Sequence, residues 1–226
     1  MIHHTSYFKH QKWFLTLSLI LIVVLGLALL CVPKGDLHLF LCDRHTHARD
    51  IFYRYYTRVA EWFPYIVCIA LLLFRRVGDG VFATACMLGS ALTTQLCKHL
   101  VNAPRPTTWF ATHMPDVTLP TVDGVHMNEW FSFPSGHTTS FFALAFVLCI
   151  LLTNQKSPIT NHKLQIALQI ILVFFATLGA YSRIYLSQHF ALDVFAGIVV
   201  GIGISALFYV LFHRFDDKKW YNYHFF

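Results

Sequence analysis

Long apolar stretches, which follow one another along the chain, constrain the fold more than any other feature of this sequence. They cover residues 13–32, 51–74, 81–100, 138–153, 164–181 and 190–212. About 20 apolar residues in a helix cross the hydrocarbon core of a bilayer, where a helix satisfies its own backbone hydrogen bonds. The sequence therefore predicts an all-α fold, with one domain over residues 1–226 that forms an integral membrane bundle of six transmembrane helices.

Charged residues are too scarce for the other classes of protein that a chain of this length could form. They make up 12% of the sequence, whereas hydrophobic residues make up 56%, and a soluble domain carries about 25% charge. The basic residues are scattered rather than clustered, which argues against a nucleic-acid partner. A signal peptide would end at small residues, but the first stretch ends at Leu29, Leu30 and Cys31. We therefore expect a bilayer to surround most of the chain.

The second apolar stretch carries charged residues in its first half. Its most apolar part, residues 62–74, is too short to cross a bilayer, but the pattern extends back to residue 51. Arg54, Arg58 and Glu61 then fall on one face of a helix, at spacings of four and three. Long cationic side chains can reach the interface from such positions. We therefore predict one helix over 51–74 that enters through the interface.

The distribution of Lys and Arg predicts the orientation. Six spans place both termini on one side, which carries nine of the 17 basic residues, Lys156 among them, while the other side carries eight. Three of those eight belong to the motifs described next, which leaves five. Short cytoplasmic loops carry an excess of Lys and Arg. We predict cytoplasmic termini and an outward-facing second side, in a bacterial inner membrane.

The first motif on the second side pairs Lys98 with Arg105 and Pro106. Lys98 lies in the last turn of the third span, and Asn102 and Pro104 should end that helix and direct Arg105 back towards it. A point-charge ammonium and a planar guanidinium held close together suit a phosphate group. Taken alone, the pair could also be two interfacial cations without a ligand.

The second motif, Pro134-Ser135-Gly136-His137, comes directly before the fourth span. Ser135 is a good N-cap, and Gly136 lets a ligand approach the backbone. The free N–H groups at a helix start bind anions, and His137 would lie in the first turn beside them. An ordinary capped helix start is the alternative.

The third motif joins the fifth and sixth spans through Ser182-Arg183, His189 and Asp193. His189 and Asp193 are four residues apart and share one helical face. A carboxylate that accepts from one ring nitrogen leaves the other nitrogen free as a nucleophile. A purely structural hydrogen bond would use the same two residues.

Together the motifs supply three cations, a helix-start anion site and two histidines on one side of the membrane. That set fits phosphoryl transfer, in which cations and N–H groups bind the phosphoryl oxygens, one histidine attacks and the other protonates the leaving oxygen. The stretch 101–137 is the longest between spans. It is too long for a passive connector, so we expect an active-site loop that covers the site.

With all three motifs present, the sequence resembles the type 2 phosphatidic acid phosphatase (lipid phosphate phosphatase) family. The resemblance implies that His189 is the nucleophile that forms a phosphohistidine, that Asp193 orients it, and that His137 is the general acid and later the base. It further implies an interfacial active site that needs no metal or other cofactor, with a phosphate pocket made of Lys98, Arg105, Ser135, Gly136 and Arg183.

The function we expect is hydrolysis of a lipid phosphate or diphosphate. By analogy, the candidate substrates are a polyprenyl diphosphate, a lipid A phosphate and phosphatidylglycerol phosphate. A phosphotransferase that uses the same intermediate, or a non-catalytic membrane protein that binds or transports a lipid phosphate, is an alternative. Vanadate-dependent haloperoxidases resemble the same motifs, but they are soluble. The sequence leaves open whether Cys31 and Cys42 form a disulfide and what the oligomeric state is.

Overall fold

The computed structural model describes residues 8–154 and 159–223, and every regular element in these ranges is a helix. Lys156, which the charge count includes, lies outside them. The α-helices are α1 (Lys12–Cys31), α2 (Lys34–Cys42), α3 (His47–Tyr56), α4 (Trp62–Arg75), α5 (Val77–Val101), α6 (Pro106–His113), α7 (Gly136–Thr153), α8 (His162–Tyr185) and α9 (Ala191–Phe212). Short 3₁₀ turns cover Lys9–Gln11, Thr57–Ala60 and His213–Phe215.

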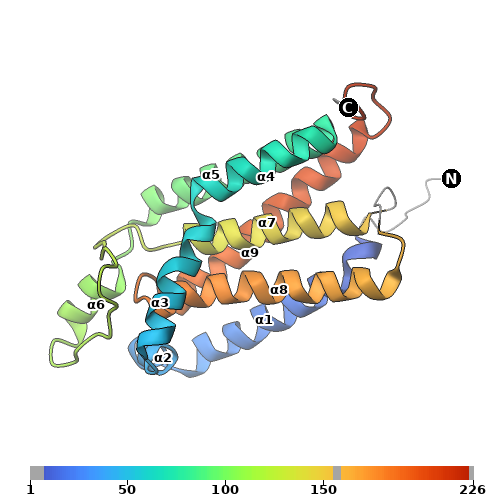
Figure 1. Cartoon of the computed structure of the whole chain (residues 1–226). Helices are drawn as coiled ribbons and strands as arrows, with labels where there is room; N and C mark the ends of the chain where they lie inside the picture. Colours follow the sequence, from blue (N-terminus) through green and yellow to red (C-terminus); the bar gives the residue numbers. More distant parts are fainter. Residues whose placement is uncertain (1–7, 155–158, 224–226) are drawn as a thin grey trace.

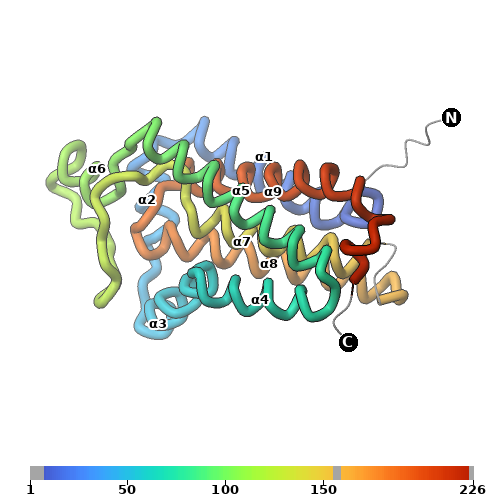
Figure 2. The backbone as a smooth tube through the Cα atoms, turned by 90° about the horizontal axis from the view of Figure 1, so that it is seen from above, coloured from blue at the N-terminus to red at the C-terminus, as the bar shows by residue number. Residues whose placement is uncertain are grey.

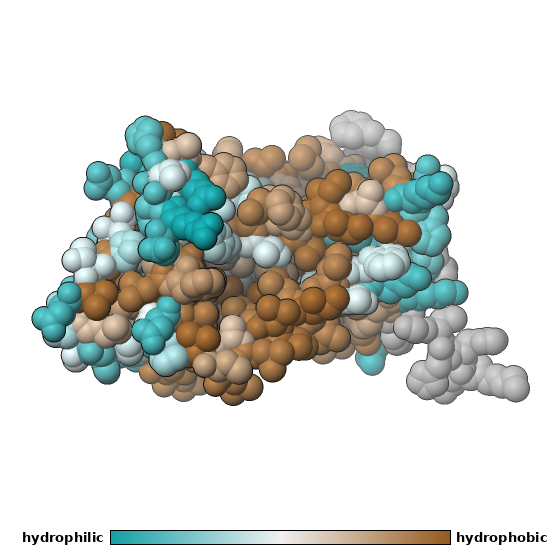
Figure 3. Space-filling view, turned by 90° about the horizontal axis from the view of Figure 1, so that it is seen from below, coloured by the Kyte–Doolittle hydropathy of each residue, from teal (hydrophilic) through white to brown (hydrophobic). Residues whose placement is uncertain are grey.

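The long helices run side by side, which confirms the predicted all-α membrane bundle (Figures 1 and 2). Five helices are long and apolar enough to cross a membrane, and the bent pair formed by α3 and α4 counts as a sixth. The start of α1 and the end of α9 lie at one end of the bundle, whereas α2, α3 and α6 gather at the other end (Figure 1). Apolar side chains cover the middle of the face in Figure 3, and hydrophilic ones gather towards both ends.

The structure divides the stretch predicted as one helix over 51–74. The segments His47–Ala60 and Trp62–Arg75 meet at an angle of 49°, and Glu61 between them is extended. Pro64 explains the break, because its ring would clash with the carbonyl group of Ala60 in a continuous helix. Helices α2 and α6 lie in stretches for which the sequence pattern predicted no helix. Both are short and flank the end of the bundle that carries the three motifs.

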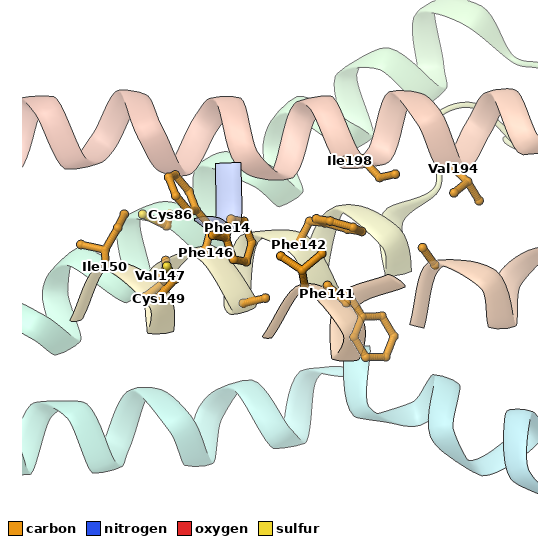
Figure 4. Packing of buried hydrophobic residues seen from close by; sticks show 14 of the residues in the cluster. Phe14, Cys86, Phe141, Phe142, Phe146, Val147, Cys149, Ile150, Val194 and Ile198 are labelled. Atoms are coloured by element: carbon orange, nitrogen blue, oxygen red, sulfur yellow. The ribbon is translucent and has the colours of Figure 1, made fainter. Parts of the chain in front are cut away.

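Helix α7 forms the centre of the bundle and packs against α5, α8 and α9. Of its 18 residues, 72% are buried, against 11% of the most apolar part of α1. Figure 4 shows Phe146 of α7 beside Phe14 of α1, while Phe141 of α7 points to the other side, where its ring packs on Tyr56 and Phe175. This tight core holds the N-terminus of α7, and with it the second motif, in a fixed place.

A stripe of small residues on α9 brings two of the motifs together. A Cβ atom on Gly201 would lie 2.5 Å from the carbonyl oxygen of Thr139, and one on Gly197 would lie 2.8 Å from that of Ser135. Only glycine permits this approach of α9 to the start of α7. As a result, the N–H of Ser135 donates to the carbonyl oxygen of Asp193 at 2.9 Å.

The six cysteines are all free in this structure. Cys31 is exposed at the end of α1, while Cys42 is buried at the end of α2. The thiol of Cys42 donates to the carbonyl oxygen of Leu39 at 3.8 Å. The two cysteines near the outer side therefore do not pair here.

Candidate active site

The start of α7 is capped as the sequence predicts. Ser135 is the N-cap, and its Oγ accepts from the N–H of Thr138 at 3.4 Å and from the Thr138 hydroxyl at 3.0 Å. The N–H of Thr139 donates to the Ser135 carbonyl oxygen at 3.0 Å. Of the N–H groups at this helix start, those of Gly136 and His137 have no hydrogen bond within the described structure. These two donors are available to an anion.

Backbone carbonyl groups orient the two cations of the first motif. Helix α5 ends at Asn102, which adopts the left-handed conformation with φ of 42°. Lys98 Nζ donates to the carbonyl oxygen of Phe131 at 2.5 Å, and Arg105 Nε donates to that of Trp130 at 3.0 Å. Both cations are only 9% exposed. Carbonyl groups of the segment 114–135, which lies over this end of α5, therefore hold both side chains.

Arg183, the third cation, is buried without a counter-ion. Its side chain donates from Nη1 to Thr57 Oγ1 at 2.7 Å and from Nη2 to Gln188 Oε1 at 3.5 Å. Its Nε is buried and has no hydrogen-bond partner. Within residues 8–154 and 159–223, no carboxylate forms an ion pair with Arg183, Lys98 or Arg105. A buried guanidinium without a paired anion is costly, which indicates a site built to receive one.

One ring nitrogen of His189 faces the cations, and the other ring nitrogen faces Asp193. Arg105 Nη1 lies 3.5 Å from Nε2 of His189. A guanidinium can only donate, so Nε2 must accept and the neutral ring carries its proton on Nδ1. Burial lowers the pKa of His189 to about 3, with a contribution from Arg105, although Asp193 raises it. The ring is therefore neutral near pH 7, with a lone pair on Nε2.

The link between His189 and Asp193 is less direct than the sequence suggested. Asp193 Oδ2 lies 3.5 Å from Nδ1 of His189, at the limit of a hydrogen bond. The same oxygen accepts from Ser132 Oγ at 2.5 Å and from the N–H of Phe190 at 2.9 Å. Ser132 Oγ is in turn 3.5 Å from Nδ1 of His189. Ser132 is fully buried and belongs to this network, although the sequence motifs do not include it.

His137 lies on the other side of the cation cluster, in the first turn of α7. Its neighbours include the cations Arg183, Arg105 and Lys98 and the imidazole of His189. Together with Lys98 and Gly136 it lines a cavity of about 150 Å³. This cavity continues between α5, α7 and the turn at Thr57–Ala60, where its lining residues are Ala60, Ala91, Thr94, Gln95, Thr139 and Ser140. The structure therefore gathers the cations, the helix start and both histidines from all three motifs.

Comparison with known proteins agrees with this geometry. The family model for the PAP2 superfamily matches residues 79–217, which is more than half of the chain and includes all three motifs. The chain belongs to the PAP2 superfamily. The predicted family relationship and the predicted class of enzyme, a hydrolase of lipid phosphates, are thereby confirmed.

Two relatives and one solved structure are similar to this chain. It is 26% identical over 190 residues to a lipid A 4′-phosphatase of Bacteroides thetaiotaomicron, covering 81% of this chain and 78% of the relative. It is 29% identical over 157 residues to phosphatidylglycerophosphatase B of Bacillus subtilis, covering 69% and 68%. The crystal structure of a transmembrane PAP2-type phosphatidylglycerolphosphate phosphatase from Bacillus subtilis superposes with a TM-score of 0.67 at 20% identity, covering 93% of this chain and 99% of that one. The last similarity establishes the fold.

Proposed function

We propose that this chain hydrolyses a lipid phosphate or diphosphate through a phosphohistidine on His189. The observation that carries the proposal is the cluster of Lys98, Arg105 and Arg183 beside a neutral imidazole. These cations are buried and form no ion pair with a carboxylate of the described residues. Cations fixed in a water-poor site stabilise the charge that develops on a phosphoryl group in the transition state. The arrangement thus supports both binding of the anion and attack on its phosphorus.

In the first proposed step, Nε2 of His189 attacks phosphorus and the P–O bond to the lipid breaks. His137 gives its proton to the leaving oxygen, which departs as a lipid alcohol or a lipid monophosphate. In the second step, water attacks the phosphohistidine, His137 takes a proton from that water, and the N–P bond breaks to release inorganic phosphate. Asp193 holds the Nδ1 proton and stabilises the ring while it carries positive charge.

The proposed phosphate pocket uses the side chains of Lys98, Arg105 and Arg183 and the free N–H groups at the helix start that Ser135 caps. These are the N–H groups of Gly136 and His137, because the N–H of Ser135 already donates to Asp193. Three cations and a helix start can neutralise the phosphoryl oxygens, which is the part that metal ions play in kinases and GTPases. We therefore propose that the reaction needs no metal.

For the substrate, we propose a lipid whose head binds at the end of the bundle that carries the motifs. The cavity at His137 lies beside the cations, between α5 and α7, and its lining is largely polar apart from Ala60 and Ala91. Lipid A and phosphatidylglycerol phosphate appear in the names of the relatives, and we add a polyprenyl diphosphate as the third candidate. The covering segment 114–135 would contact the head and select it.

Phosphate release from a panel of lipid phosphates tests this function. We expect the purified protein to release inorganic phosphate from at least one of lipid A, phosphatidylglycerol phosphate and undecaprenyl diphosphate, with EDTA present throughout. The rate with EDTA should equal the rate without it. Loss of activity in EDTA that returns with a divalent cation would contradict metal independence. Transfer of the phosphate to a second lipid, without release of free phosphate, would indicate a phosphotransferase.

We further propose that the protein lies in a bacterial inner membrane with both termini in the cytoplasm and the active site outside. The start of α1 and the end of α9 lie at one end of the bundle and the motifs at the other, consistent with this orientation. A fluorescent reporter that matures only in the cytoplasm, fused after Phe226, should fluoresce. A reporter inserted in the exposed stretch 115–118 should stay dark. The reverse pattern would show that the proposed orientation is wrong.

A further inference from the structure

The tight turn after α8 places Gln188 in the middle of the site. The carbonyl oxygen of Arg183 accepts from the N–H of Gln188 at 3.0 Å and from that of His189 at 3.1 Å. Ser187, just before them, adopts the left-handed conformation with φ of 49°. The turn therefore folds back on the end of α8, and the Gln188 side chain is 3% exposed.

The amide oxygen of Gln188 is shared by two of the cations. Oε1 accepts from Arg105 Nη1 at 3.2 Å and from Arg183 Nη2 at 3.5 Å. Arg105 Nη1 also donates to the Gln188 carbonyl oxygen at 3.1 Å. Two buried guanidinium groups repel each other, and a neutral oxygen between them offsets this repulsion without cancelling their charge. The oxygen therefore sets the spacing of the two guanidinium groups.

The amide nitrogen of Gln188 connects the same side chain to the covering segment. Nε2 donates to the carbonyl oxygen of His126 at 2.9 Å and lies 3.1 Å from Sδ of Met127. The orientation of the amide is thus determined, because the guanidinium groups need an acceptor and the His126 carbonyl group needs a donor. Only an amide satisfies both sides.

We infer that Gln188 is a positioning residue that holds Arg105 and Arg183 at the spacing a phosphate requires and couples them to the segment over the site. The inference rests on the proposed function, because it assumes that the two arginines bind phosphate. A carboxylate at this position would form ion pairs with both guanidinium groups and compete with the phosphate. An apolar side chain would leave buried donors without a partner.

Binding of inorganic phosphate to the purified full-length protein, measured by isothermal titration calorimetry, tests the inference without turnover. Gln188→Met should raise the dissociation constant for phosphate about tenfold, and Gln188→Glu should raise it further. In turnover, Gln188→Met should raise KM about as much and lower kcat far less than Arg183→Ala, because both arginines stay in the site and still stabilise the transition state. Amide hydrogen exchange at 126–132 should become faster in Gln188→Met.

The matched control is Gln169→Met, since Gln169 is also buried and accepts from two backbone N–H groups, at the opposite end of α8. It should leave phosphate affinity unchanged. Equal affinities in Gln188→Met and the wild type, or an equal loss in Gln169→Met, would overturn the inference. Gln188→Asn, which keeps the amide but shortens it, should also weaken phosphate binding if the Met variant does not fold. A wild type that binds phosphate but hydrolyses no lipid phosphate would contradict the proposed function alone.

Discussion

His189→Ala is expected to reduce phosphate release by about 10⁴-fold or more, since removal of a catalytic nucleophile has effects of this order. The reason is that Nε2 of His189 carries a nucleophilic lone pair and lies 3.5 Å from Arg105 Nη1, inside the cation cluster. Phosphate release from the best lipid in the panel measures the effect. His113→Ala is the control, because His113 lies exposed on α6 and stacks on Trp109. It should keep most of the activity, whereas an active His189→Ala variant would show that another group attacks phosphorus.

The pH dependence of stability and that of catalysis separate two roles of His189. Its pKa of about 3 lies below the ordinary value of 6.5, so the folded protein favours the neutral ring. The unfolded chain therefore binds more protons between these values, and His189 costs stability as the pH falls from 6.5 towards 3. In the His189→Asn variant, the loss of stability as the pH falls from 6.5 towards 3 should be smaller than in the wild type. Catalytic loss in the wild type between pH 6.5 and 4 should then come from groups other than His189.

Arg183→Ala is expected to lower kcat about 10²- to 10³-fold, the usual effect of removing one donor that stabilises the transition state. Arg183 has no ion pair to a carboxylate in the described part of the chain, and its Nε has no hydrogen bond. Removing it therefore relieves a buried charge, so the thermal midpoint should stay equal or rise while activity falls. Activity and the thermal midpoint, measured on the same preparation, check both expectations.

Arg54→Ala is the control for the prediction on Arg183→Ala. Arg54 is also interfacial, but it donates to the carbonyl oxygen of Asp123, away from the histidines. Arg54→Ala should keep activity within a few-fold. Arg183→Lys should recover only part of the activity, because an ammonium keeps the charge but not the planar fork. Equal activities for Arg54→Ala and Arg183→Ala would remove Arg183 from the proposed pocket.

The membrane fold and the three motifs were predictable because their signals are local. Hydropathy is summed over about 20 neighbouring residues, and each motif occupies a short segment at a span end. The pattern missed the break at Glu61 and the short helices α2 and α6. Pro64 was the available signal for the break. Helices α2 and α6 are too short for a clear apolar period.

The residues that support the motifs were harder to predict. Ser132 and Gln188 are ordinary polar residues in connecting segments, and nothing in their own sequence marks them. Ser132 Oγ bonds to Asp193, 61 positions later in the chain, and Gln188 bonds to Arg105 and to the carbonyl oxygen of His126. Such partners become neighbours only when α9 packs on α7 and the segment 114–135 folds over the end of the bundle.

The sequence alone determined that this chain is a helical membrane protein with three cations and two histidines, our proposed phosphate site, at one end of its spans. It could do so because burial in lipid and helix starts leave their mark on adjacent residues. Only the tertiary structure decided how the parts meet. Gly197 and Gly201 let α9 approach α7, and the turn at Ser187 aims Gln188 between two arginines. Arg183 is buried and forms no ion pair with a carboxylate in the part of the chain that the structure describes. Long-range packing sets these distances, and it depends on the whole bundle rather than on any one segment.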